Sequence, residues 1–174
     1  MKHTKTCISH QAWDIPDACD CLGVHYSSGK DDWETPDDLF DIYNTLYHFV
    51  LDAAANGVNH KCPMWYGPDS PIQVYDALEA DWGPHLEKGN IWLNPPYSRS
   101  LQSKFIEKVV REVHPSPHVH LTHNVVALLP SRTDTRLFHE WVKPWALHIE
   151  FLKGRIKFVG GKSVAPFPSM IVVF

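Results

Sequence analysis

The segment GNIWLNPPY, which ends at Tyr97, carries the residues best suited to chemistry. Its apolar run Ile91–Leu93 is followed by two prolines, which predicts a buried strand that ends there, because proline has no N–H to continue a ladder. After the strand, Asn94 offers a side-chain amide, Pro95 a carbonyl of fixed direction and Tyr97 an aromatic face. Such a set suits a planar substrate with an amino group. We therefore interpret Asn94-Pro95-Pro96-Tyr97 as catalytic; the alternative is an X-Pro turn after a core strand.

A carboxylate follows a second predicted strand. The apolar stretch His48–Leu51 predicts that strand, and Asp52 ends it. The small residues Ala53, Ala54 and Ala55 come next and would let a ligand approach the backbone closely. Ligands in open α/β sheets bind beyond the carboxyl ends of the strands, so we expect Asp52 to bind one. The alternative is that Asp52 caps a turn.

Two further groups of polar residues are weaker candidates. Asp76, beside Ala77, also precedes the central strand, although an acidic residue on a solvated turn is the commoner case. The arm at the start of the chain holds Cys and His residues, but Cys19 and Cys21 lack the spacing of paired zinc ligands. We expect no metal there. The alternative is a zinc site, whose ligands would be drawn from Cys7, His10, Cys19, Cys21 and His25.

Alternating helix and strand patterns surround these residues. Thr35 is expected to cap a helix with Pro36 at its first position, and Lys104–Val113 predicts a second, amphipathic helix. A short helix is expected around Leu137–Trp141. The remaining strand candidates are Met64–Tyr66, Asn124–Pro130, Leu147–Leu152, Arg155–Val159 and Ser169–Phe174, the last two joined across Gly160-Gly161. Such alternation predicts a doubly wound, mostly parallel α/β sheet with an antiparallel terminal hairpin at its edge.

Composition fits one domain with a sizeable core, since 44% of the 174 residues are hydrophobic. We expect residues 1–30 to form an irregular N-terminal arm and residues 31–174 to form the domain. The apolar runs are too short for a transmembrane span, and the opening residues lack the apolar region of a signal peptide. These features predict a cytoplasmic protein with no membrane partner and with reduced thiols.

Charge is distributed unevenly along the chain. Residues 1–98 hold five Lys and Arg against fifteen Asp and Glu, whereas residues 99–174 hold eleven against five. A basic half could face the phosphates of a nucleic acid although the net charge is −4. Accidental clustering on a solvated surface is an equal alternative on charge alone.

From about Asp32 to Phe174, the chain resembles the small phage-type DNA adenine-N6 methyltransferases. Asn94-Pro95-Pro96-Tyr97 is similar to their catalytic motif, and Leu51–Ala55 to their first cofactor strand. The resemblance implies a Rossmann-like methyltransferase fold that binds S-adenosylmethionine. The cofactor residues that it implies are Trp33, Thr35, Pro36, Asp52, Ala53, Ala54, Asp76, Ala77 and Asn94. The chain has alanines where most methyltransferases have a glycine-rich turn, and it has no separate target-recognition stretch.

The resemblance also implies how the catalytic motif works. The Asn94 side-chain oxygen and the Pro95 carbonyl would accept the two protons of the adenine amine, and Tyr97 would stack on a base flipped out of the duplex. One alternative is methylation of a protein glutamine amide, since those enzymes also carry Asn-Pro-Pro-Tyr. Another is an inactive nucleic-acid-binding module with the same fold.

Four arginines are expected to contact DNA. Arg99 lies just after the catalytic motif, and Arg132 and Arg136 follow the next strand that ends in proline. The loops after consecutive strands of a doubly wound sheet gather along one edge, so these three should surround the base pocket. Arg155, in the last predicted hairpin, is the fourth.

Overall fold

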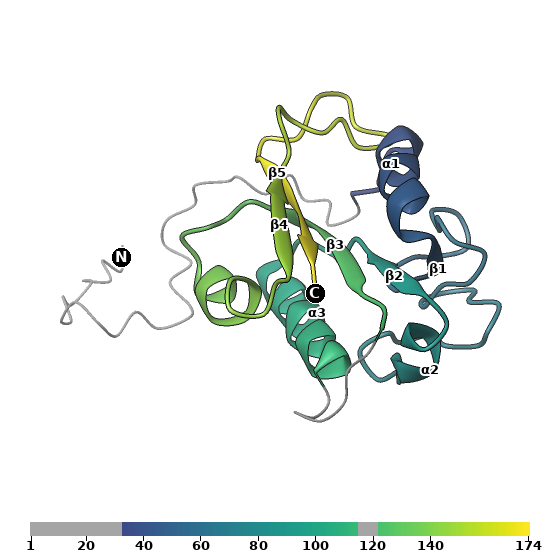
Figure 1. Cartoon of the computed structure of the whole chain (residues 1–174). Helices are drawn as coiled ribbons and strands as arrows, with labels where there is room; N and C mark the ends of the chain where they lie inside the picture. The colour runs from purple at the N-terminus through teal and green to yellow at the C-terminus, as the bar shows by residue number, and fades with distance from the viewer. Residues whose placement is uncertain (1–32, 115–121) are drawn as a thin grey trace, which may run out of the picture.

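Five strands form one sheet in the order β1-β2-β3-β5-β4 (Figure 1). The computed structural model describes residues 33–114 and 122–174, so the predicted arm, with its Cys and His residues, lies outside the described residues. The strands are β1 (Phe49–Asp52), β2 (Asn90–Leu93), β3 (Val125–Pro130), β4 (His148–Phe151) and β5 (Ser169–Val173). No described helix combines the length and apolar character needed to cross a membrane.

The position of the antiparallel strand in the sheet differs from the prediction. β1, β2 and β3 are parallel neighbours, as expected. The antiparallel strand is β5, but it lies between β3 and β4 and pairs with both, so it is not at the edge of the sheet. All strands except β5 consequently end at the same edge, which is the upper one in Figure 1.

The sheet is covered on both faces because its side chains alternate between two cores. Leu51, Ile91 and Leu93 point to a core shared with helices α2 (Gly83–Leu86), α3 (Arg99–Val113) and η1 (Phe138–Val142). Phe49 and Trp92 point to the opposite core, which is shared with α1 (Asp37–Tyr47) and with the segment 152–167. The result is a mixed α/β fold around a mostly parallel sheet.

Two helices begin at other residues than predicted. Pro36 is the N-cap of α1 and has extended backbone angles (φ −62°, ψ 141°), so Asp37 is the first helical residue and Thr35 caps nothing. Thr35 precedes a proline, which favours an extended backbone, and its side chain is buried. α3 begins at Arg99, two residues after Tyr97 and five residues before the predicted start.

The predicted strand Arg155–Val159 is wrong, and so is the predicted Gly160-Gly161 hairpin. This segment forms part of the long loop between β4 and β5, which are the true antiparallel pair. Its backbone makes isolated bonds: the Val159 N–H donates to the Glu34 carbonyl at 3.0 Å, and the Ala165 N–H donates to the Ile156 carbonyl at 2.7 Å. The loop is therefore attached to the residues that precede α1.

The predicted short strand Met64–Tyr66 is reduced to one bridge, between Asp52 and Trp65. Beside it, Gly67 takes a positive φ of 134°, and a Cβ atom there would come within 2.0 Å of the Ala55 carbonyl oxygen. The small residues after β1 thus allow a close approach by the chain's own 64–67 segment. This contact holds the loop 56–75 against the carboxyl end of β1.

Candidate active site

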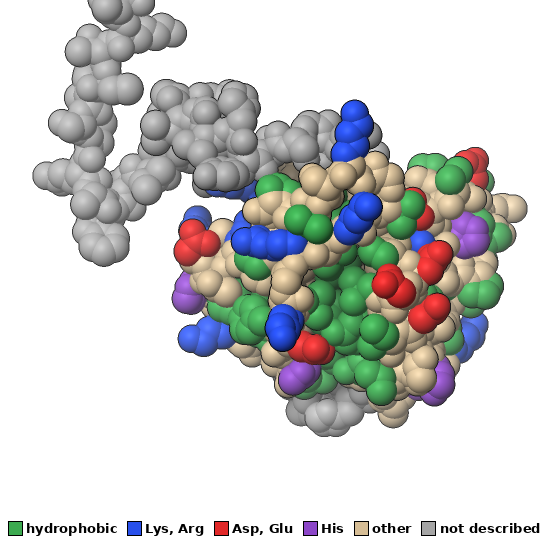
Figure 2. All heavy atoms as spheres, turned by 90° about the horizontal axis from the view of Figure 1, so that it is seen from above, with side chains coloured by type: hydrophobic (Ala, Val, Ile, Leu, Met, Phe, Trp, Pro, Cys, Tyr) green, Lys and Arg blue, Asp and Glu red, His purple; other side chains and the backbone are tan. Residues whose placement is uncertain are grey.

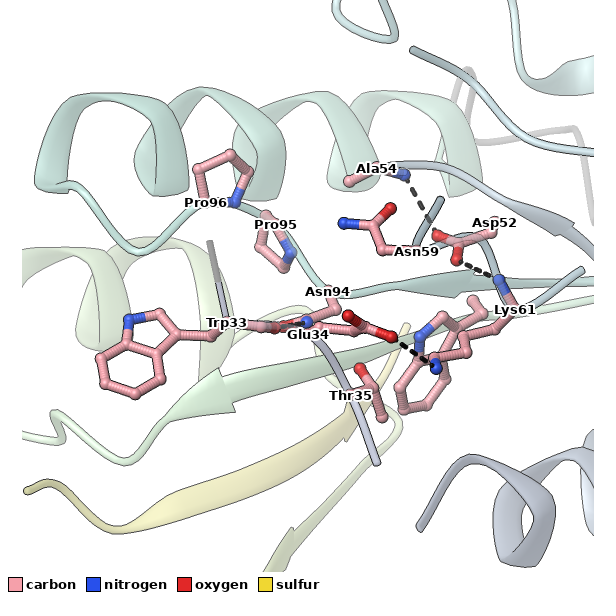
Figure 3. A pocket seen from close by; sticks show the side chains of 11 residues that line it. Trp33, Glu34, Thr35, Asp52, Ala54, Asn59, Lys61, Asn94, Pro95 and Pro96 are labelled. Carbon is pink, nitrogen blue, oxygen red and sulfur yellow. Dashed lines mark hydrogen bonds and ion pairs between the residues drawn. The ribbon is translucent and has the colours of Figure 1, made fainter. Parts of the chain in front are cut away.

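A pocket opens at the carboxyl ends of β1 and β2, where the chemistry was expected (Figure 3). It contains about 420 Å3 of empty space when its open mouth is included. β1 contributes Asp52, β2 contributes Trp92, and the residues between the arm and α1 form another wall. The lining residues are Trp33, Glu34, Thr35, Asp52, Ala54, Asn59, Lys61, Trp92, Asn94, Pro95 and Pro96.

Asp52 is 3% exposed at the end of β1. One carboxylate oxygen accepts the Ala54 N–H at 3.3 Å, and the other accepts the Lys61 backbone N–H at 3.0 Å. Burial raises the pKa of Asp52 to about 6, although these two hydrogen bonds favour the ionised form. Asp52 therefore carries its charge only above mildly acidic pH.

Lys61 brings a cation to the same pocket. Its Nζ atom donates to Asp37 at 2.6 Å and to Glu34 at 3.3 Å, and its side chain is 9% exposed. Burial lowers the pKa of Lys61, but the two carboxylates outweigh burial and raise it overall. The pocket thus places a carboxylate that titrates near pH 6 and a permanent ammonium on neighbouring walls, as Figure 3 shows.

Asn94 is held in one orientation at the end of β2. Its Nδ2 donates to the Trp33 backbone carbonyl, and its Oδ1 accepts the Tyr97 hydroxyl at 2.9 Å. A backbone carbonyl only accepts hydrogen bonds, so the amide nitrogen must face Trp33 and the amide oxygen must face Tyr97. An amide oxygen has two lone pairs, so Oδ1 keeps one for another donor.

Tyr97 is 5% exposed. Its ring packs edge-on against Phe158 at 6.1 Å and Phe167 at 5.6 Å between centroids, and its hydroxyl also lies 3.3 Å from the Leu128 carbonyl. Burial raises the pKa of the Tyr97 hydroxyl, which stays protonated and can donate to Asn94. With the loop between β4 and β5 in this position, the ring of Tyr97 belongs to the core.

The structure brings together only some of the residues expected at the cofactor site. Trp33, Thr35, Asp52, Ala54 and Asn94 line the pocket. Four others do not: Asp76 is exposed and accepts the Leu78 N–H at 2.9 Å, and the remaining ones are Pro36, Ala53 and Ala77. Ala53 and Ala77 are buried core residues.

Four pocket residues were missed by the sequence analysis. Glu34 adjoins the predicted Trp33 and Thr35, and Trp92 lies in the predicted strand, so nearness to those positions could have indicated both. Asn59 and Lys61 reach the pocket only through the irregular path of the loop 56–75, which no periodic pattern reveals. The close contact of Gly67 with Ala55 helps to fix that path.

The four predicted arginines occupy different surroundings. Arg99 and Arg155 are exposed, and Arg132 is half-buried beside Thr135 and Leu137. Arg136 is exposed and forms an ion pair with Glu140 at 3.1 Å. Figure 2, which looks onto the carboxyl edge of the sheet, shows most of the Lys and Arg side chains toward one side of this face and several Asp and Glu side chains toward the other, with some charges of the opposite sign on each side.

A mixed α/β, mostly parallel sheet with Asn-Pro-Pro-Tyr beside a pocket, at the carboxyl end of a central strand, is compatible with a Rossmann-like methyltransferase. The chain belongs to the DNA N-6-adenine-methyltransferase (Dam) family, whose sequence profile matches residues 25–170. It is accordingly a DNA adenine methyltransferase.

Two relatives agree with this assignment. Over 70 residues, 38% of this chain and 71% of the relative, the chain is 41% identical to the protein named "Putative methyltransferase YfdM" of Escherichia coli (strain K12). Over 112 residues it is 29% identical to the DNA N-6-adenine-methyltransferase of Escherichia phage T1, and this match spans 64% of the chain but 40% of the phage protein.

Proposed function

We propose that the protein transfers the methyl group of S-adenosylmethionine to the N6 amine of a specific adenine in DNA. The observation that carries the proposal is the fixed Asn94 amide: Asn94 lines the pocket, and its Oδ1, which accepts the Tyr97 hydroxyl, has a second lone pair. Residues 31–174 would form the methyltransferase domain, with the two covered faces of a doubly wound Rossmann-like sheet.

The pocket fits the amino acid end of S-adenosylmethionine. Asp52 and Glu34 are acceptors for an ammonium group, whereas Lys61 is a donor for a carboxylate. Trp92 is fully buried, and its indole N–H has no acceptor among the described residues, so a ligand in the pocket could satisfy it. When bound, the cofactor supplies a methyl group on a sulfonium, which is a strong electrophile.

Asn94 and Pro95 prepare the nucleophile. The adenine amine is a poor nucleophile because its lone pair is conjugated with the ring. Hydrogen bonds from its two protons to Asn94 Oδ1 and to the Pro95 carbonyl would draw electron density onto the nitrogen and favour a lone pair aimed at the methyl group. The Trp33 carbonyl and the Tyr97 hydroxyl keep Asn94 Oδ1 pointed for this task.

The target base must leave the duplex to reach this site. We infer that it displaces Phe158 and Phe167 from the ring of Tyr97, which would then stack on the base. This step would move the loop between β4 and β5. The same loop carries the exposed Arg155, so DNA binding could favour the movement.

Incubation with labelled S-adenosylmethionine and DNA, followed by digestion and identification of the nucleoside, tests the proposal. We expect N6-methyladenine in the wild type. For Asn94→Ala we expect the rate of methyl transfer to fall by about 100-fold or more, whereas cofactor affinity should stay within a few-fold of the wild type. Label in RNA or protein alone would contradict the proposal, as would normal turnover by Asn94→Ala.

A further inference from the structure

A second, smaller pocket lies at the carboxyl end of β3, on the side of α3 and η1. It shares no lining residue with the cofactor pocket. Apolar side chains form most of its wall, and the polar members are Gln102, Arg132 and Thr135. The complete lining is Gln102, Leu129, Pro130, Arg132, Thr135, Leu137, Phe138, Val142 and Met170.

Gln102, among the polar residues that line this pocket, has a buried donor without a partner among the described residues. It is 5% exposed, and its Nε2 has no acceptor among the described residues. One helical turn earlier on the same side of α3, the buried hydroxyl of Ser98 is also unpartnered, as is that of Ser131 at the end of β3. Buried donors are nearly always satisfied in folded proteins, so Gln102 Nε2 calls for an acceptor from beyond the described residues, and a bound ligand would supply one.

The charges around the pocket favour an anion. Arg132 lines the pocket and forms no ion pair with any described residue. α3 is 15 residues long and starts at Arg99, and its N-cap Ser98 makes no side-chain capping bond, so the first N–H groups of the helix lack a cap. The N-terminus of α3, the Arg132 guanidinium and the N–H groups of the Gln102 amide all attract negative charge.

The pocket also adjoins the catalytic motif. Only the N-cap Ser98 separates Tyr97 from α3, and the Tyr97 hydroxyl contacts the Leu128 carbonyl, one residue before the pocket residue Leu129. The charge of Arg132 reaches the Tyr97 hydroxyl, where it lowers the pKa that burial raises. A ligand here would therefore lie next to the flipped nucleotide.

We propose that Gln102 and Arg132 clamp a non-bridging oxygen of a backbone phosphate beside the target adenine. This inference rests on the proposed function, because it requires DNA as the substrate. A phosphate presents only acceptors and a negative charge, whereas base edges mix donors with acceptors. The Gln102 amide nitrogen and the Arg132 guanidinium are both donors, and the Thr135 hydroxyl already donates to the Arg132 carbonyl at 2.7 Å.

Methylphosphonate scanning tests the clamp. In a DNA duplex that contains the target adenine, each phosphate near that adenine is replaced singly by a neutral methylphosphonate. Binding of the protein to each duplex is measured by fluorescence anisotropy. We expect the wild type to lose about tenfold in affinity at one position. Gln102→Leu should bind unmodified DNA several-fold more weakly and should lose little more at that same position, because its clamp is already broken.

Lys104→Ala is the matched control, since Lys104 is exposed on the same helix. It should keep the wild-type profile. Gln102→Leu retains the side-chain volume and removes an unpartnered donor, so its thermal midpoint should be equal or higher. If Gln102→Leu fails to fold, Arg132→Ala takes its place in the scan, with the same expected profile.

Two results would overturn the clamp. One is a Gln102→Leu profile identical to that of the wild type. The other is a uniform loss of affinity that leaves every methylphosphonate position as sensitive as before. In either case methyl transfer by the wild type would leave the proposed function intact, whereas absence of both DNA binding and methyl transfer would remove both proposals.

Discussion

At the scale of single residues, Asp52 links the pocket to pH. Its pKa of about 6 lies above that of a free aspartate because the side chain is buried. If the ionised carboxylate receives the ammonium of S-adenosylmethionine, affinity should rise about tenfold from pH 5 to pH 7 and then level off. Titration calorimetry across this range measures the rise. Asp52→Asn should bind weakly at every pH, and a wild-type slope in that variant would assign the titration to another group.

The same shift affects the free protein in the opposite direction. Asp52 binds its proton more tightly when folded than when unfolded, so the contribution of this residue to stability falls as pH rises from about 4 to about 6. We expect Asp52→Asn to be the more stable protein at pH 7 in the absence of cofactor. Urea unfolding at pH 4.5 and pH 7 measures the difference, which should shrink at the lower pH. A constant difference would mean that the charge of Asp52 is not its cause.

At the scale of elements, the loop 56–75 depends on one glycine. A Cβ on Gly67 would lie 2.0 Å from the Ala55 oxygen at a φ of 134°. Gly67→Ala should therefore cost about 3 kcal/mol of stability and weaken cofactor binding, because Asn59 and Lys61 would shift. Gly154→Ala is the control: Gly154 also has a positive φ, but nothing lies within 4 Å of its added Cβ. Denaturant unfolding should show a cost for Gly154→Ala of about 1 kcal/mol, and equal costs would disprove the steric argument.

The elements also show what the sequence could predict. Ile91–Leu93 and Val125–Pro130 are wholly apolar, and both proved to be buried inner strands, because such runs are stable only between two covered faces. Arg155–Val159 alternates like a strand, yet Ile156 and Phe158 pack into the core from a loop that pairs with no described strand. Alternation of apolar and polar residues indicates which side chains are buried. It does not show whether a neighbouring strand is present to form hydrogen bonds with the segment.

At the candidate site the prediction was limited in the same way. Asp52 and Asn94 end strands, so their meeting at one edge follows from parallel topology. Lys61 reaches the pocket from an irregular loop, and its partners Glu34 and Asp37 lie more than twenty residues away in the sequence. Contacts of this kind depend on the path of the loop and leave no periodic pattern.

At the scale of the whole molecule, DNA binding should depend on arginines unequally. Arg132 makes no ion pair with the described residues, whereas Arg136 is engaged with Glu140. Arg132→Ala should therefore reduce the slope of log affinity against log salt by about one unit, and Arg136→Ala by clearly less. Fluorescence anisotropy at several salt concentrations gives the slopes, with Lys104→Ala as an unchanged reference. Equal slopes of log affinity against log salt for all three variants would mean that the surface facing the phosphates lies elsewhere on the protein.

The position of β5 between β3 and β4 also bears on the order in which the strands can pair during synthesis of the chain. β4 is synthesised before β5, yet among the described strands it pairs with β5 alone, whereas β1, β2 and β3 pair with one another in the order of their synthesis. The cofactor side of the sheet can therefore assemble while translation continues. We therefore expect the loop between β4 and β5 to take its final position over Tyr97 only after β5 has been synthesised.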